Sequence, residues 1–534
     1  MDIKIIAPST ASHRLHEDGL EVWELHALTP VSALPGNPSD MELRQRSGHW
    51  ARIEADDRQV RLYTDRIMSF PLYYARSGDQ WVVGGDVYQV AQAANRQTRN
   101  ENAARELLNC AHTLSHHTLF DGVYAVEAGT RVTLTADGVS RHCWGQPRYA
   151  TAGTTDARQF GEEFDRELTK AFADAVQNLG GKQVVVPLSG GIDSRLLVLY
   201  LRKVQAPNVI AFTYGKPGSR EVETSRAVAE KLGIPWHGVE LPTNQMRATW
   251  NSSEGGQFAR ATWSGFALPH VQDWWALRQL RAKGVLRPGD VVFPGHTIVG
   301  NMHHFEVFDT PWDRGEIGRA VAEHHWCLRT RGPRSKADWE LVRRALAEAM
   351  KETKWAVEEG DDTVAARRST QDLVEWVNLK HRQAKYINNS MRPYEYFELN
   401  WAMPMLDSNV WNAWLQGSEQ LTAERHWYRQ FTDEMWEEYT GEQVQYFAPA
   451  STAMNPRVKA AALSLMRVSG ADRTLSKARS IRSQLNHPMA FEAFATGHSQ
   501  RQLATELLRG RTQMGVWTKL FLENQWTGGE PVVP

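Results

Sequence analysis

The sequence predicts an α/β protein in which an antiparallel β-rich domain precedes a doubly wound parallel sheet with extra helices. Three patterns lead to this fold class. Hairpin signals dominate residues 1–150, short apolar runs alternate with helical stretches after residue 156, and the chain is almost wholly helical from about residue 338. A length of 534 residues allows about two to four domains. The patterns reduce this estimate to two domains, at 1–150 and 156–534.

The N-terminal domain is predicted from its hairpins. Residues 52–54 and 60–63 alternate in polarity on either side of Asp56-Asp57, as the two strands of a hairpin do. Further strands are expected next to turn-forming residues, at 71–75, 81–83 and 131–134. One helix is expected over 103–108. This succession of short strands and tight turns is typical of an antiparallel sheet.

The second domain is predicted from an alternation of strands and helices. Residues 151–155 are small and polar and are expected to form the linker that leads into it. An amphipathic helix is expected over 160–179. Buried strands are then expected at 184–188, 209–214 and 290–294, and helices at 195–203 and 221–232. This order predicts parallel strands joined by helical crossovers.

Composition excludes several classes of protein. Lysine and arginine total 61 against 62 acidic residues, so the basic surplus of a general nucleic-acid binder is missing. The three cysteines are far apart and form no CxxC pair, which argues against a disulfide framework or a thiolate zinc site and fits a reducing cytoplasm. No signal peptide and no membrane span are expected, because long apolar runs are missing. We therefore expect a cytoplasmic protein, and a homodimer is left open.

The strongest local signal is the hexapeptide Ser189-Gly190-Gly191-Ile192-Asp193-Ser194, between a predicted buried strand and a predicted helix. Glycines let the backbone approach a phosphate closely, and a helix N-terminus offers unpaired N–H groups. Asp193 could hold Mg²⁺ against a pyrophosphate. A capped turn is the plain alternative. The loop is not a Walker A motif, because no lysine follows its glycines.

The hexapeptide resembles the pyrophosphate loop of the N-type ATP pyrophosphatases, which adenylate a substrate oxygen and release pyrophosphate. Other segments resemble the asparagine-synthetase-like family, including its glutaminase domain at 65–74 and 118–123 and its helical C-terminal block at 381–407. The resemblance implies an N-terminal domain like a degenerate Ntn glutaminase and a synthetase domain like the adenine nucleotide α-hydrolases. It also implies ATP and Mg²⁺ as cofactors. The expected nucleotide-binding residues are Leu188, Ser189, Gly190, Gly191, Asp193, Ser194, Thr213 and Gly295, with Asp193 as the metal ligand.

Two departures from the family's pattern matter. The family's glutaminase uses a cysteine directly after Met1 as its nucleophile, and Asp2 stands there in this sequence. We therefore expect no glutamine hydrolysis, as in the similar β-lactam synthetases and lasso-peptide macrocyclases, where an amine of the substrate attacks the acyl-adenylate. The family also carries an aspartate after the second loop glycine, where this sequence has Val299. Glu221, Glu223 and Glu306 are candidates to replace this metal ligand.

Three residues are predicted to be catalytic. Lys385, on a predicted helix, could stabilise the phosphates or a developing oxyanion. Glu395, beside Tyr394, could deprotonate the attacking amine, as a Tyr–Glu pair does in β-lactam synthetases. His296 follows Gly295 at the carboxyl edge of the predicted sheet. The plain alternatives are a solvated lysine, a salt-bridged glutamate and a buried structural histidine.

Several other features are open to two interpretations. The 21 tryptophans are expected to serve packing, with an acceptor pocket near Trp263, Trp274 and Trp275 as the alternative. A metal site at His303-His304 with Glu306 is weakly indicated. The pairs His116-His117 and His324-His325 are expected at the surface. The basic tail from residue 455 is expected to be a solvated face, with Lys459 as a candidate catalytic lysine.

These observations favour an ATP-dependent, AMP-forming amide ligase of a specialised biosynthetic pathway. A small-molecule or peptide carboxylate is adenylated, and an amine then displaces AMP. Ring closure of the lasso-peptide or β-lactam type is one alternative, and a catalytically impaired scaffold protein is another.

Overall fold

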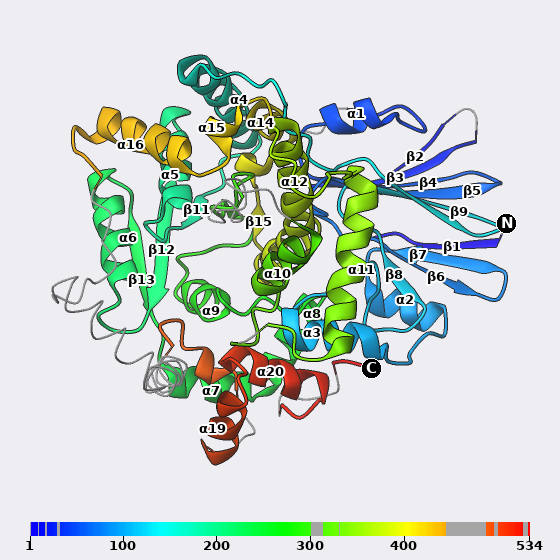
Figure 1. Ribbon diagram of the computed structural model, residues 1–534. Helices are drawn as coiled ribbons and strands as arrows, with labels where there is room; N and C mark the ends of the chain where they lie inside the picture. Colours follow the sequence, from blue (N-terminus) through cyan, green and yellow to red (C-terminus); the bar gives the residue numbers. More distant parts are fainter. Residues whose placement is uncertain are drawn as a thin grey trace, which may run out of the picture.

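The computed structural model describes residues 2–8, 10–16, 19–28, 33–300, 313–330, 332–444, 487–495, 500–526 and 532–534. It has a mixed α/β architecture with two sheets that are mainly antiparallel and one parallel sheet. The mainly antiparallel strands lie on one side of the molecule and the parallel strands on the other, with a block of helices drawn between them (Figure 1). The fold class expected from the sequence is confirmed at this level.

The N-terminal strands form two sheets that pack face to face. A six-stranded sheet has the order β10-β9-β5-β4-β3-β2, and a four-stranded sheet has the order β1-β7-β6-β8. Their facing sides share an apolar core that includes Ile53 and Leu62 from the first sheet and Tyr74 and Val83 from the second. The strands are β1 (Asp2–Ile6), β2 (Ser12–Leu15), β3 (Glu21–His26), β4 (Trp50–Ala55), β5 (Gln59–Thr64), β6 (Tyr73–Ser77), β7 (Gln80–Gly84), β8 (Val123–Ala125), β9 (Thr130–Thr135) and β10 (Val139–Cys143).

The three predicted hairpins are confirmed. Strands β4 and β5, β6 and β7, and β9 and β10 each pair antiparallel across the expected turns. The predicted helix corresponds to α3 (Glu101–Cys110), while α1 (Asp40–Gln45) and α2 (Val87–Ala93) were not predicted. Nor were β1, β2 and β3, and β1 pairs parallel to β7. The purely antiparallel domain expected from hairpins was therefore wrong for its first strand, because a pairing between strands far apart in sequence leaves no turn signal.

The parallel sheet has five strands in the order β13-β12-β11-β14-β15. Its strands are β11 (Val184–Pro187), β12 (Val209–Gly215), β13 (Trp236–Glu240), β14 (Val291–Val292) and β15 (Asn400–Trp401). The first three valines of β11 are completely buried, as expected for a central strand covered on both faces. Strand order reverses beside β11, with β12 on one side and β14 on the other. Ligands of doubly wound sheets bind outside such a point of reversal.

Helices connect and flank these strands. The predicted helices correspond to α4 (Ala157–Gln177), α5 (Ile192–Lys203) and α6 (Arg220–Lys231). The segment predicted as a linker is held in place, because Thr154 N–H donates to Gln416 O and Ser418 N–H donates to Thr154 O. The remaining helices before the helical block are α7 (Thr243–Trp250), α8 (Ser253–Thr262) and α9 (Trp274–Ala282).

The C-terminal third is mainly helical where it is described, with β15 as its strand. A ten-residue π-helix, η2 (Asn378–Ile387), continues directly from α12. The other helices are α10 (Arg314–His325), α11 (Lys336–Thr353), α12 (Val364–Val377), η3 (Asn388–Ser390), α13 (Met391–Tyr396), η4 (Pro404–Leu406), α14 (Ser408–Trp414), α15 (Glu419–Thr422), α16 (His426–Thr440), η5 (Phe491–Ala493), α19 (Gln500–Leu508) and α20 (Gln513–Leu522). None of the described helices has the length and apolar character that a membrane crossing requires.

Candidate functional site

The glycine loop joins β11 to α5 in the strand–loop–helix arrangement that the sequence predicted. Ser189 Oγ lies 3.0 Å from Ser194 Oγ and accepts a hydrogen bond from Gly191 N–H at 3.2 Å. Gly190 has φ +76°, and a Cβ atom there would lie 2.6 Å from Thr224 Cγ2. Backbone conformation and contact with α6 therefore both require glycine at this position.

The N-terminus of α5 is open to a ligand. Gly191 is the N-cap, and no side chain caps this helix end. The first turn of an α-helix has N–H groups without an intrahelical partner, and these groups carry a partial positive charge. Such a helix end, reached through a glycine loop, is a preferred binding place for phosphate.

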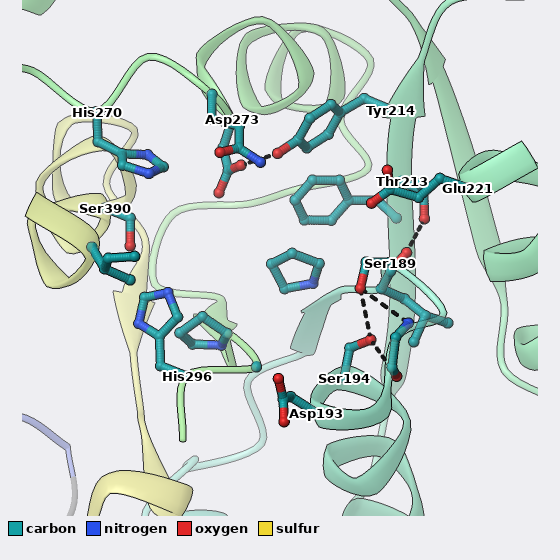
Figure 2. A pocket seen from close by; sticks show the side chains of 18 of the residues that line it. Ser189, Asp193, Ser194, Thr213, Tyr214, Glu221, His270, Asp273, His296 and Ser390 are labelled. Carbon is teal, nitrogen blue, oxygen red and sulfur yellow. Dashed lines mark hydrogen bonds between the residues drawn. The ribbon is translucent and has the colours of Figure 1, made fainter. Parts of the chain in front are cut away.

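A cavity of about 280 Å³ lies at this end of the sheet. Its walls come from the segments that follow β11 and β14, from β12, and from residues 270–273 and 387–394. Figure 2 shows Ser189 and Ser194 on one side of the space, with His296 and Ser390 opposite. The lining residues are Pro187, Leu188, Ser189, Gly191, Asp193, Ser194, Phe212, Thr213, Tyr214, Glu221, His270, Gln272, Asp273, Pro294, Gly295, His296, Ile387, Ser390 and Tyr394.

Three carboxylates line the cavity, and no lysine or arginine of the described residues does so. Asp193 lies in the first turn of α5, and its Oδ1 forms an ion pair with Arg425, the residue that precedes α16. Burial raises the pKa of Asp193, and the Arg425 charge opposes this shift. Burial also raises the pKa of Glu221. The cavity therefore carries a surplus of negative charge.

The third carboxylate, Asp273, is held by two tyrosines. Tyr214 O–H donates to Asp273 Oδ1, and Tyr394 O–H donates to Oδ2 at 2.7 Å. Burial raises the pKa of both tyrosines well above the usual value, so both remain protonated donors. This arrangement joins β12, the start of α9 and α13 at the cavity wall.

Two histidines of the cavity are neutral. Burial lowers the pKa of His296 to about 3, and nearby His270 adds to this shift while a hydrogen bond with Asn388 opposes it. Burial also lowers the pKa of His270. His296 Nδ1 is buried and has no hydrogen-bond partner among the described residues. A neutral imidazole with a free nitrogen can accept a hydrogen bond from a ligand, and the lowered pKa makes protonation of this nitrogen unfavourable.

The structure brings most of the predicted site residues together. Leu188, Ser189, Gly191, Asp193, Ser194, Thr213, Gly295 and His296 all line the cavity. Gly190 lies in the same loop behind them, against Thr224. Gly295 packs on the first turn of α5, since a Cβ there would lie 3.2 Å from Ser194 N. Val299, at the position of the expected aspartate, is buried at 1% exposure.

Lys385 lies outside the cavity. Its ammonium is fully buried and contacts Ser115 O at 2.5 Å, Thr113 O at 3.2 Å and Glu127 Oε1 at 3.4 Å. These partners belong to the N-terminal part of the chain, so the geometry does not support a contact with phosphates. The carboxylate and the backbone carbonyls that hold this ammonium are more than 250 positions away in the chain, so no pattern near residue 385 could have shown them.

Glu395 also lies outside the cavity. Its carboxylate is paired with Arg392 at 2.8 Å and accepts a hydrogen bond from Trp401 Nε1 at 3.0 Å. Tyr394, one residue earlier, does line the cavity. Neighbouring residues on α13 thus point to different places, and the two members of the expected Tyr–Glu pair are separated.

The remaining predictions have mixed outcomes. Packing is the role of Trp263, Trp274 and Trp275, which are at most 4% exposed and do not line the cavity. The surface position expected for His325 was wrong, because this residue is fully buried, with Nδ1 3.2 Å from His112 Nε2. The three cysteines are free, as expected. The predictions for His303, His304, Glu306 and Lys459 lie outside the described residues.

Sequence reasoning did not single out Asp273, His270 or Arg425. Asp273 and His270 belong to the segment 269–274, which has no motif of its own in the sequence. The tyrosines that contact Asp273 lie far from it in the sequence. Their proximity, which would have identified the site, is visible only in the structure. Arg425 is 232 positions from Asp193 in the chain. No local pattern could have indicated this ion pair.

The sheet order and the loop between β11 and α5 define an α/β fold with a cavity at the reversal of strand order. Residues 165–285, which contain the loop, the three carboxylates and Tyr214, match the asparagine synthase family. This match indicates ATP-dependent amidation or ligation as the general class of activity.

Among solved structures, the chain is similar to the NH3-dependent NAD synthetase from Campylobacter jejuni subsp. jejuni, with 15% identity. The similarity covers 38% of this chain and 84% of that chain, with a TM-score of 0.21. This similarity is too low to carry an argument. No curated protein matches the chain.

Proposed function

We propose that the protein is an ATP-dependent ligase that adenylates a substrate carboxylate and joins it to an amine, releasing AMP and pyrophosphate. The observation that carries this proposal is the uncapped helix end behind the glycine loop, which opens into a cavity at the reversal of strand order. The N-terminal part would be a degenerate glutaminase-like domain, and the part from residue 156 an α-hydrolase-like synthetase domain.

The charge of the cavity supports Mg²⁺ as a cofactor. ATP carries several negative charges, and carboxylates without a lining lysine or arginine would repel them. Asp193 and Glu221 are the oxygen donors that would hold Mg²⁺, which commonly takes one or two carboxylates together with substrate phosphates. When bound, Mg²⁺ would neutralise phosphate charge and favour departure of pyrophosphate. The N–H groups of α5 and the hydroxyls of Ser189 and Ser194 would orient the phosphates.

The reaction would run in two steps. A carboxylate oxygen attacks the α-phosphorus, the bond to the β-phosphate oxygen breaks, and pyrophosphate leaves. The amine nitrogen then attacks the acyl carbon, and the bond to AMP breaks. His296 Nδ1, which has no partner among the described residues, would accept a hydrogen bond from the attacking nitrogen and orient it, and the proton that the nitrogen loses would pass to the departing AMP or to solvent. The Asp273–tyrosine group would orient the acyl substrate.

The state of the cysteines supports an amine source other than glutamine. Burial raises the pKa of the Cys143 thiol to about 12 and that of Cys110 well above the usual value, and the exposed Cys327 has a raised rather than a lowered pKa. A nucleophilic cysteine is typically an accessible thiolate with a lowered pKa. None of the three lines the cavity described above.

An exchange assay tests the proposal. Labelled pyrophosphate is expected to enter ATP only when a suitable carboxylate is present, and a panel of amino acids, peptides and small organic acids would identify that acid. Consumption of ATP with an amine should give AMP rather than ADP. The absence both of exchange with every acid and of ATP-dependent thermal stabilisation would contradict the proposal and favour a scaffold role.

A further inference from the structure

A second cavity, of about 550 Å³, lies between the N-terminal strands and the segment that contains α13 and β15. Its volume is within the range of small-molecule sites, which commonly lie where two parts of a fold meet. Its lining residues are Pro8, Thr10, Leu25, His26, Ala27, Leu28, Phe70, Pro71, Gly85, Asn178, Arg392, Glu395, Leu399, Asn400 and Trp401.

The short helix α13 separates this cavity from the first one. Tyr394 lines the first cavity, while Arg392 and Glu395 line the second. A guanidinium and a carboxylate thus face the same space from one helix. The two groups are paired through Arg392 Nη2 and Glu395 Oε1, at 2.8 Å.

This pair leaves both charged groups with unused hydrogen-bonding capacity. Arg392 Nη2 also donates to Ser69 O at 3.2 Å, but Nε and Nη1 have no hydrogen-bond acceptor within the described part of the chain. Glu395 Oε1 also accepts from Trp401 Nε1, while Oε2 has no donor there. The Arg392 side chain is 19% exposed and that of Glu395 is 37% exposed. Both free ends are therefore accessible to a ligand in the cavity.

The other walls are largely apolar and aromatic. The rings of Phe70 and Trp401 lie 5.3 Å apart, centroid to centroid, and the Arg392 guanidinium lies 5.9 Å from the Phe70 ring centre. Leu25 and Leu28 add aliphatic surface. The cavity thus combines one cation, one anion and an apolar wall.

We propose that the second cavity binds a free α-amino acid with an apolar or aromatic side chain. The ligand carboxylate would accept hydrogen bonds from Arg392 Nε and Nη1, and its ammonium would donate to Glu395 Oε2. Its side chain would pack against Phe70 and Trp401. A ligand with only one of the two charges would leave either the guanidinium or the carboxylate without a partner, so the pair selects a zwitterion. This binding requires no ATP and is independent of the function proposed above.

Calorimetry on the full-length protein without nucleotide tests the proposal. Leucine is compared with N-acetyl-leucine, which lacks the ammonium, and with leucinamide, which lacks the carboxylate. Leucine is expected to bind at least about tenfold more tightly than either analogue, because each analogue loses one charge-assisted contact. Equal affinities for the three compounds, or no binding of leucine and phenylalanine at millimolar concentration, would overturn the proposal without any variant.

Two substitutions then assign the contacts. Arg392→Gln is expected to weaken leucine binding about tenfold and to leave leucinamide binding unchanged, while Glu395→Gln weakens leucine and leaves N-acetyl-leucine unchanged. The matched controls are Arg281→Gln and Glu398→Gln, since these residues form a neighbouring ion pair at 2.7 Å and do not line the cavity. Leucine affinity should not change in either control. Circular dichroism would verify the fold of each variant. An undiminished leucine affinity in both folded cavity variants would refute the assignment.

Discussion

Two regions of this molecule contain buried charged residues. They differ in how far those charges are paired with charges of opposite sign within the protein. Around Lys380 and Lys385 each ammonium is buried against a carboxylate, because Lys380 contacts Glu127 at 3.0 Å and Glu352 at 2.8 Å, and Lys385 contacts Glu127 at 3.4 Å. In the cavity at the glycine loop, carboxylates line a space that no described lysine or arginine lines. Only the second region has electrostatic capacity left for a ligand.

This difference in charge pairing distinguishes a buried cation that stabilises the fold from one that could act on a ligand. Both regions contain charged groups that burial perturbs, so perturbation alone does not identify a functional site. The lysine pair is completed by protein groups, whereas the cavity's carboxylates are the groups that would hold Mg²⁺ in the proposed reaction. The group of His116, Glu127 and Glu348, whose ligand atoms lie within 4.8 Å of one another, belongs to the first kind, because Lys380 already contacts both glutamates.

The largest expected effect is the loss of stability on substitution of Lys385, which tests whether this residue belongs to the structural region or to the cavity. Replacing Lys385 with methionine should lower the free energy of unfolding by about 3 to 5 kcal/mol, because removal of one partner from a buried ionic group leaves the others uncompensated. The activity per folded molecule should stay unchanged, since the ammonium does not reach the cavity. Urea titration and pyrophosphate exchange would measure the two quantities.

Lys351→Met, on the exposed face of α11, is the matched control and should change stability by less than about 0.5 kcal/mol. A Lys385→Met protein of normal stability that had lost exchange would reverse the comparison and return Lys385 to the role expected from the sequence.

The parts of the fold that were predictable are local in sequence. The glycine loop was found because six consecutive residues carry its chemistry, and the hairpins were found because a turn joins their strands. Strand β13 was missed because the sequence WHGVE lacks an apolar run, and β15 has only two residues. The parallel pairing of β1 with β7 joins residues about 80 positions apart, beyond the reach of any turn pattern.

The site was predictable on the same terms. Residues that follow directly from the sheet's carboxyl edge reached the cavity, including His296. Residues assigned from helical blocks did not, because Lys385 is held by Ser115 and Glu127, and Glu395 lies on a different face of α13 from Tyr394. The sequence resemblance predicted that residues 381–407 are helical, but it did not predict which way their side chains point.

Asp193→Asn should have the opposite pattern of effects to Lys385→Met, with activity lost and stability kept. Loss of the carboxylate that would hold Mg²⁺ should reduce pyrophosphate exchange about 100- to 1,000-fold. Burial raises the pKa of Asp193 in the folded protein, so ionisation of this group costs stability above its unfolded pKa. The neutral amide avoids this cost, and the melting temperature should be equal or higher.

Asp174→Asn, on the surface of α4, is the control and should leave exchange unchanged. Full exchange in Asp193→Asn would show that the carboxylate surplus of the cavity does not serve catalysis.

Gly190→Ala tests whether the backbone conformation of the glycine loop is required for nucleotide binding. A Cβ there would lie 2.6 Å from Thr224 Cγ2 at φ +76°, so the loop must shift and nucleotide affinity should fall about tenfold. Gly180→Ala is the control, because Gly180 has φ +56° with no atom within 4 Å of the added Cβ. Both variants pay for the positive φ, and only Gly190→Ala should lose ATP binding measured by calorimetry. Equal binding in the two variants would argue against a required loop conformation.

The smallest expected effect concerns Arg425, which forms an ion pair with Asp193 at the edge of the cavity. Its charge lowers the pKa of Asp193, which burial raises. Removing the charge in Arg425→Gln leaves burial unopposed, so Asp193 should become protonated at a higher pH. If ionised Asp193 holds Mg²⁺, the acid limb of the exchange activity should move upward by about one pH unit, while activity at pH 9 stays near that of the unchanged protein. Profiles between pH 5 and 9 would measure the shift.

Arg425→Lys keeps the positive charge and should restore much of the original acid limb, which a purely structural role of the guanidinium would not predict. Arg429→Gln, an exposed position one turn further along α16, should leave the profile unchanged. A uniform loss of activity at every pH in Arg425→Gln would assign Arg425 to the packing of α16 against α5 rather than to the charge of the cavity. If the acid limb instead moves with the charge at position 425, Arg425 sets the pKa of Asp193 although it does not line the cavity.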